Sequence, residues 1–368
     1  MKRRQMLKAA VGGGVAAAAG AAVSRTAPAL AQGRRELTMV TTWPRNFPGL
    51  GTSAERLARR ITAASDGALR IRVFGAGEKL APFDSFAAVS RGEIDMYHAH
   101  EHYWVGQSPA YAFFAAVPFG LTAAEMNAWI YWHGGQALWD ELAAGHNIKS
   151  LLAGNTGAQM GGWFGREIAG LEDLNGLRFR IPGLGGEVLR RLGAEAVSLP
   201  GGEIFPALQA GKIDGTEWLG PWNDLAFGFH RVVRNYYYPG FHEPGTALAL
   251  GLNKGLWDGL DEASRQLIAN ATAAENVITL AEFDTMNAAA LEILSYRHGV
   301  QLRRLPDEVL RAMGRVSGEV VAEFGATDAL SRRIYQSFIK ARKAAIGWSK
   351  YGQGSFTEAR ALRFKYSD

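Results

Sequence analysis

The sequence contains no cysteine among its 368 residues, and this absence excludes several classes of protein. Without thiols there is no disulfide framework, no cysteine-ligated zinc and no cysteine nucleophile. A charge excess is also missing once the N-terminus is set apart. Residues 1–31 hold five of the 40 Lys and Arg residues and no acid, so the remainder carries 35 bases and 35 acids. We therefore expect no nucleic-acid partner.

Long hydrophobic runs are absent as well, even near the N-terminus. Residues 1–8, MKRRQMLK, form a twin-arginine start, and an Ala- and Gly-rich stretch of modest hydrophobicity follows at 9–23. This stretch is too short to span a bilayer, which takes about 20 apolar residues. The small-x-small pattern at 29–31 predicts cleavage after Ala31. We interpret residues 1–31 as a twin-arginine signal peptide and expect a periplasmic protein.

The rest of the chain has a globular composition and enough length for two lobes. From residue 37 onward, runs typical of strands alternate with helical patterns, which indicates βαβ units and a mixed or parallel sheet. The expected strands are 37–43, 69–74, 94–100, 148–153, 177–181, 194–199, 213–217 and 247–253. The expected helices are 53–64, 83–89, 123–143 and a long one at 261–294, with further helices through 348. These patterns predict a two-lobed α/β protein with a helical C-terminal third, and ligands of such proteins bind in the cleft at strand ends.

Histidines gather in the short segment 98–102, HAHEH. Residues two apart share one face of a strand, so the imidazoles of His98, His100 and His102 could converge on a metal ion. No second motif completes a catalytic zinc site. We favour a strand that runs into a polar cleft edge, where one histidine or Tyr103 touches a ligand.

Two glycine-rich segments allow more than one interpretation. Residues 183–186, GLGG, follow an expected strand but match neither the dinucleotide-binding nor the P-loop pattern, so a tight turn is favoured. Residues 154–159, GNTGAQ, end another strand. They are either a solvated loop or a crossing between lobes that carries amide ligands.

Charged residues close two further strands. Arg178 and Arg180 alternate along 177–181, and an arginine at a cleft edge is suited to bind a carboxylate with two parallel hydrogen bonds. Glu217 ends the next strand, and Glu243 follows an aromatic run. If both glutamates meet an anionic ligand, three negative charges require a cation. Oxygen ligands favour a hard ion such as Na⁺ or Ca²⁺.

Several linked motifs resemble the signature of the TRAP-type (tripartite ATP-independent periplasmic) solute receptors. They are LEDLNGLRFR at 171–180, PxxExFxALQxGxxDGxE at 200–217 and LNKxxW at 252–257. The resemblance covers nearly the whole chain from residue 37, in the expected order. Two features depart from the family pattern: Phe205 stands where the family often has tyrosine, and the histidine segment is not typical.

Residues 216–224 and 238–244 look most like the branch that binds 2-oxo or 2-hydroxy monocarboxylates, such as pyruvate or lactate, with a metal ion. The resemblance implies a two-lobed clamshell with a long helix across both lobes. The implied substrate-binding residues are Arg180, Gln159, Asn155 and Tyr103. The implied metal ligands are Glu217, Glu243, Gln159 and the backbone carbonyl of Trp218.

The domain prediction places lobe I at 32–155 with about 244–282, and lobe II at 156–243 with about 283–325. Residues 326–368 are expected to form a C-terminal helical extension. Some relatives pair through such a helix, and residues 331–350 could serve a homodimer in the same way.

The leading hypothesis is a receptor without enzymatic activity that delivers a small organic acid to the membrane permease subunits of a TRAP transporter. One alternative is an exported, metal-assisted enzyme that acts on an α-keto or hydroxy acid with a histidine as base. The other is a sensory module that reports the ligand to a receptor kinase.

Overall fold

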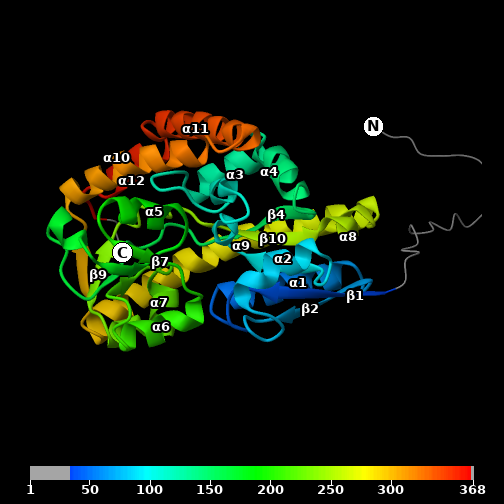
Figure 1. Cartoon of the computed structure of the whole chain (residues 1–368), viewed down its shortest axis with the longest axis horizontal. Coiled ribbons are helices and arrows are strands. Elements are labelled where there is room, and N and C mark those ends of the chain that lie inside the picture. The colour runs from blue at the N-terminus through cyan, green and yellow to red at the C-terminus, as the bar shows by residue number, and fades with distance from the viewer. Residues whose placement is uncertain (1–33, 366–368) are drawn as a thin grey trace, which may run out of the picture. The chain divides into compact units, whose positions relative to one another are not determined.

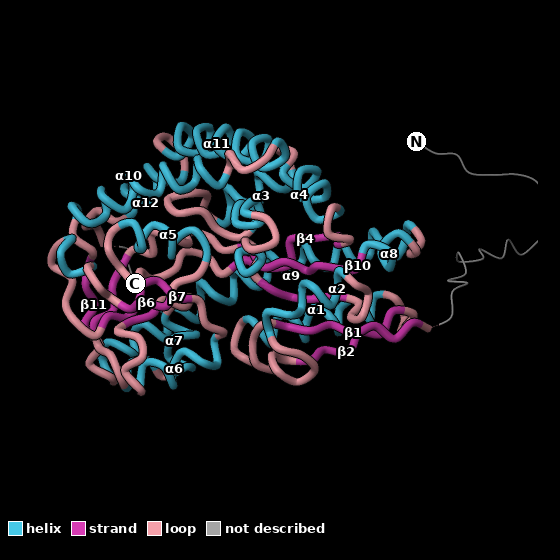
Figure 2. The backbone as a smooth tube through the Cα atoms, viewed as in Figure 1, coloured by secondary structure: helices cyan, strands magenta, loops and turns pink. Residues whose placement is uncertain are grey.

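The computed structural model describes residues 34–365, so the signal-peptide prediction for residues 1–31 lies outside the described part. Two mixed β-sheets, coloured magenta in Figure 2, organise this part of the chain. The first sheet has the strand order β2-β1-β3-β10-β4. Its strands are β1 (Arg35–Thr41), β2 (Leu69–Phe74), β3 (Met96–Ala99), β4 (Ile148–Asn155) and β10 (Ala247–Asn253). Strands β1, β2 and β3 are parallel, and β10 runs antiparallel to both of its neighbours.

The second sheet has the order β11-β9-β5-β8-β6-β7 and consists of shorter strands. They are β5 (Gly162–Phe164), β6 (Arg178–Arg180), β7 (Glu195–Val197), β8 (Gly215–Thr216), β9 (Asn235–Tyr238) and β11 (Gln301–Arg304). Strands β6 and β8 are parallel, with Arg180 opposite Thr216. Since the carboxyl ends of parallel strands lie at the same edge, Arg180 and the residue after Thr216 are neighbours.

Helices cover both sheets, as Figure 1 shows. Those before the long helix are α1 (Leu50–Ala64), α2 (Ser85–Ser90), α3 (Ala123–Tyr131), α4 (Gly135–Ala144), α5 (Gly183–Arg191), α6 (Gly201–Gln209), α7 (Pro221–Phe227) and α8 (Lys254–Asp258). The others are α9 (Glu262–Glu292), α10 (Asp307–Phe324), α11 (Ala329–Ser349) and α12 (Gln353–Arg360). Within residues 34–365, none of the helices combines the length and apolarity needed to cross a bilayer.

The 31-residue helix α9 connects the surroundings of the two sheets. Its N-terminus is capped by Asp261, whose carboxylate accepts a hydrogen bond from the Ser264 amide at 2.7 Å. The helix packs against β4 and α1 on the side of the first sheet and against α7 on the side of the second (Figure 1). The predicted long helix is confirmed.

Helix α11 packs against the part of the chain that precedes β4. Its Phe338 is fully buried and lies edge-on to Phe113 and Trp129, with ring centroids 5.5 and 5.1 Å away. Helix α10 packs against α5, which follows β6 of the second sheet. The C-terminal third is therefore helical, as the sequence predicts.

One detail of the predicted secondary structure is wrong. The expected single helix at 123–143 is two helices, because the chain turns at Gly134, whose φ of +81° is a left-handed conformation suited to glycine. The glycine-rich segment 183–186 forms the first turn of α5, and Gly183 has a positive φ of +61°. Strands β5, β9 and β11 were not predicted, since their sequences, GWF, NYYY and QLRR, show no regular alternation of apolar and polar residues.

Candidate functional site

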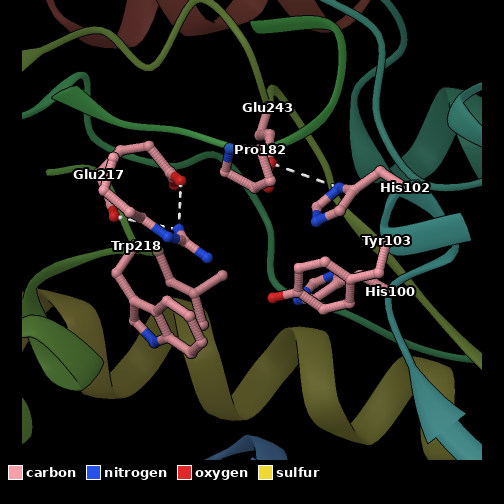
Figure 3. A pocket seen from close by; sticks show the side chains of 9 residues that line it. His100, His102, Tyr103, Pro182, Glu217, Trp218 and Glu243 are labelled. Carbon is pink, nitrogen blue, oxygen red and sulfur yellow. Dashed lines mark hydrogen bonds and ion pairs between the residues drawn. The ribbon is translucent and has the colours of Figure 1, made fainter. Parts of the chain in front are cut away.

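A small pocket lies where the end of β3, the ends of β6 and β8, and the segment after β9 come together (Figure 3). The empty space there is small, about 180 Å³ with its opening to solvent included. The lining residues are His100, His102, Tyr103, Arg180, Pro182, Glu217, Trp218, Leu219 and Glu243. The wall is polar and suits a small, charged molecule.

Arg180, the last residue of β6, is 1% exposed and is held in place by four hydrogen bonds. Its Nε and Nη2 donate to the Leu199 carbonyl at 3.1 and 3.0 Å. Its Nη1 donates to the Glu217 carboxylate at 2.5 Å and to the Glu217 carbonyl at 3.3 Å. The indole of Trp218 lies 5.0 Å from the guanidinium carbon. The guanidinium is thus fixed by the protein before any ligand arrives.

Glu217 directly follows β8 and shares its charge between two partners. One carboxylate oxygen pairs with Arg180, and the other lies 3.3 Å from Nε2 of His242. Burial acts to lower the pKa of His242, but the hydrogen bond to Glu217 and the charges of Glu217 and Glu243 outweigh it, so this pKa is raised. His242 was not among the predicted site residues, although it stands next to Glu243 in the sequence.

Glu243 reaches the same place from the segment after β9. Its Oε2 accepts hydrogen bonds from Gln159 at 2.8 Å and from Thr246 at 2.6 Å, and its Oε1 lies 3.5 Å from Nδ1 of His102. Burial raises the pKa of Glu243 to about 7, and the nearby Glu217 carboxylate adds to this rise. The backbone joins the segments, since the Gln159 amide donates to the Glu243 carbonyl.

The donor set fits a cation. Ligand atoms of Glu217, His242 and Glu243 all lie within 4.8 Å of one another. Gln159 adds a further oxygen, because its Oε1 is buried and has no hydrogen-bond partner among the described residues. Carboxylate and amide oxygens suit hard cations. Trp218, whose carbonyl is a predicted ligand, lines the pocket beside them.

The opposite wall comes from the histidine segment. His100 and His102 line the pocket with their rings stacked, 4.9 Å apart and 9° from parallel, whereas His98 does not line it. Burial lowers the pKa of His98 to about 4 and that of His100 to about 3, and it also lowers the pKa of His102. These imidazoles are therefore neutral near pH 7, and the three rings do not converge as one metal site in the described chain.

The remaining predicted residues have different positions. Tyr103 lines the pocket (Figure 3) and its hydroxyl interacts with the Arg180 side chain. Asn155 is fully buried but does not line the pocket; its side chain bonds the backbone of Gly157 at 2.9 Å and of Gly245 at 3.4 Å. Arg178 pairs with Asp214 at the surface, away from Arg180's pocket.

Comparison with known proteins assigns this arrangement to a family. The model of the bacterial extracellular solute-binding proteins, family 7, matches residues 39–328. The chain belongs to this family of TRAP solute-binding receptors. A monocarboxylate 2-oxoacid-binding periplasmic protein from Nostoc is 37% identical to this receptor over 361 residues, which are 97% of this chain and 98% of the relative.

Solved structures of TRAP solute-binding proteins share the receptor's fold. One from Bordetella bronchiseptica, with calcium and picolinate, has a TM-score of 0.87 and 33% identity, covering 90% of this chain and 100% of its own. One from Pseudoalteromonas atlantica, with sodium and pyruvate, has a TM-score of 0.86, 34% identity and the same coverages. One from Colwellia psychrerythraea, with calcium and pyruvate, has a TM-score of 0.85 and 33% identity over 89% of this chain and 99% of its own.

Proposed function

We propose that this receptor binds a small 2-oxo or 2-hydroxy monocarboxylate, similar to pyruvate or lactate, together with Na⁺ or Ca²⁺. It then delivers the acid to the permease subunits of a TRAP transporter. The observation that carries this proposal is the meeting of Arg180 with the carboxylates of Glu217 and Glu243 in one small pocket. Gln159 lies directly behind Glu243, since its Nε2 donates to Oε2 of Glu243 at 2.8 Å. A carboxylate and a cation are the two partners that such a set binds.

Charge balance supports a bound cation. A ligand carboxylate beside Glu217 and Glu243 gives three negative charges against the single positive charge of Arg180. Calcium would neutralise the remainder, and sodium would leave one negative charge that a protonated His242 could balance. An uncompensated charge in a buried pocket is costly, so we expect acid and cation to bind together.

Within this proposal, Arg180 and Tyr103 contact the acid. Glu217, Glu243, Gln159 and the Trp218 carbonyl hold the cation. We assign Asn155 a positioning role instead of a ligand contact, because its amide is occupied by the backbone of Gly157 and Gly245. The receptor catalyses no reaction, and the family of transport receptors supports this.

The proposal includes a periplasmic location after twin-arginine export and cleavage behind Ala31, and the two lobes with the bounds predicted from the sequence. The known relatives support the location, since the Nostoc protein is named as periplasmic. Ligand contacts from both sheets are what a closing clamshell needs, because closure requires that the ligand bind the closed state more tightly.

We also propose a homodimer through the C-terminal extension. Large apolar side chains on and after α11 are exposed: Trp348 is 71%, Tyr351 83% and Phe356 61% accessible. Such a cluster is typical of an interaction surface, and the Bordetella bronchiseptica relative is described as a dimer. Light scattering of residues 32–368 should give twice the monomer mass, and Trp348→Ser should lower it. A monomer mass for the unchanged protein would contradict the dimer.

Calorimetric titration tests the central claim. Residues 32–368 are titrated with pyruvate and then with lactate, each in chelator-treated sodium-free buffer, in Na⁺ and in Ca²⁺. We expect tight binding that depends on one of the cations. Equal affinity in all buffers would contradict the roles of Glu217 and Glu243, and turnover of either acid would contradict a receptor.

A further inference from the structure

The proposed function leaves two buried imidazole nitrogens of the pocket wall unexplained. Within the described residues, Nε2 of His102 and Nδ1 of His100 have no hydrogen-bond partner. Both residues are almost completely buried, at 4% and 2% exposure, and both line the pocket. Buried polar atoms in proteins are usually paired, so an unpaired pair at a ligand pocket indicates a contact that the ligand completes.

The surroundings of His102 determine what this contact is. Nδ1 of His102 lies 3.5 Å from the Glu243 carboxylate, which is a hydrogen-bond acceptor. An acceptor on this side favours the ring proton on Nδ1, and that tautomer leaves a lone pair on Nε2. Figure 3 shows Nε2 turned away from Glu243 and toward the side of the pocket where Tyr103 lies. A ligand must offer a donor there, not another acceptor.

His100, whose ring is stacked on that of His102, also has one paired and one unpaired ring nitrogen. Its ring hydrogen-bonds the backbone of Ala247, and its unpaired nitrogen is Nδ1. A neutral imidazole that donates through one nitrogen accepts through the other. The stacked rings of His100 and His102 thus present two acceptors on one wall, opposite the wall of Glu217 and Trp218 (Figure 3).

We propose that the acid bound by this receptor carries an additional hydroxyl group, which donates a hydrogen bond to Nε2 of His102 with Nδ1 of His100 as a second acceptor. This inference rests on the proposed function, since Arg180 and the cation are taken to hold the carboxylate end. The methyl group of pyruvate or lactate has no donor and would leave His102 unpaired. Sites built to bind a hydroxyl discriminate strongly against the analogue that lacks it.

Two matched pairs of acids test the inference on the unchanged protein. Hydroxypyruvate is compared with pyruvate, and glycerate with lactate, by calorimetry in the cation that supports binding. We expect the hydroxylated member of at least one pair to bind about tenfold more tightly or better, as one satisfied buried acceptor implies. Equal or weaker binding of the hydroxylated member in both pairs would overturn the inference while leaving the carboxylate and cation site standing.

Variants assign the preference to the histidine. His102→Phe keeps an aromatic ring but removes both ring nitrogens, so the affinity ratio within each pair should fall toward one. His102→Gln, which retains an acceptor oxygen, should keep part of the ratio. His133→Asn alters an exposed histidine at the turn between α3 and α4 and serves as the matched control with the original ratio. An unchanged ratio in His102→Phe would refute the role of His102.

Failure of this inference is distinguishable from failure of the proposed function. If none of the four acids binds in any cation, the proposed ligand class is wrong. If pyruvate binds with a cation and the hydroxyl adds nothing, then water pairs with His102 and only the inference fails. If His102→Phe does not fold, the comparison of acids on the unchanged protein still decides the question.

Discussion

The buried ion pair of Arg180 and Glu217 can be tested by replacing Arg180 with methionine, a side chain of similar length. Both members of the pair are 1% exposed, so the change leaves a buried carboxylate without its main partner. Removing one member of a buried pair typically costs about 3–5 kcal/mol. The low end, about 3 kcal/mol, applies here, because His242 still lies 3.3 Å from the other oxygen of Glu217.

The Leu199 carbonyl adds a smaller contribution. It accepts two hydrogen bonds from Arg180, and leaving it unpaired costs about 1 kcal/mol. We therefore expect Arg180→Met to lower the free energy of unfolding by about 4 kcal/mol. The same change should abolish measurable binding of the acid, since the cationic partner of the carboxylate is gone.

Urea denaturation of the ligand-free protein in chelator, followed by tryptophan fluorescence, measures this effect. Glu217→Gln and the double variant complete the cycle. The double variant should be more stable than the sum of the single losses implies, with a coupling of about 2–3 kcal/mol. Single losses that add within about 0.5 kcal/mol would show that the pair is not a stabilising unit and would refute the reasoning.

Three further predictions concern separate parts of the receptor. Glu243→Gln should weaken the binding of the cation directly, and the binding of the acid as a consequence. Calorimetry that finds the same cation dependence as in the unchanged protein would contradict this. Burial raises the pKa of Glu101 to about 7, so the folded state keeps a proton that the unfolded chain loses near pH 4.5, and stability should fall as pH rises between these values. Glu101→Gln should reduce this change of unfolding free energy with pH, measured by denaturation at several pH values. An unchanged pH dependence would show that another group causes it. Phe338→Ala should cost about 3–5 kcal/mol by opening a cavity between α11 and the rings of Phe113 and Trp129, whereas Lys340→Ala on the same helix should cost little.

The elements predicted well from the sequence are those with a strong local signal. Strand β10 has the predicted bounds, since an uninterrupted apolar run fits a strand between two others. The residues at the ends of β6 and β8 were singled out because a charged side chain at a strand end can reach a cleft, and the resemblance to the TRAP receptors then implied their roles. In the structure these residues, Arg180 and Glu217, meet at 2.5 Å.

Features that depend on tertiary contacts were beyond sequence reasoning. The strand expected at 213–217 is only the two-residue β8, whose length is set by pairing with β5 on one side and β6 on the other. The order of residues likewise does not show that His242 lies beside Glu217, or that the Asn155 side chain bonds the backbone of Gly157 and Gly245. The available sequence signal for His242 was its place next to Glu243, after an aromatic run. Its contact with Glu217 depends on the path of the chain after β9.

The ion pair between Arg180 and Glu217 has a consequence for how the receptor responds to its surroundings. In the ligand-free pocket each group serves as counterion for the other. On the proposed function, an arriving acid occupies Arg180 and releases Glu217 for the cation, and an arriving cation releases Arg180 for the acid. Such coupling is reciprocal, so each solute raises the affinity for the other by the same factor. The receptor would then bind its acid efficiently only where acid and cation are both plentiful.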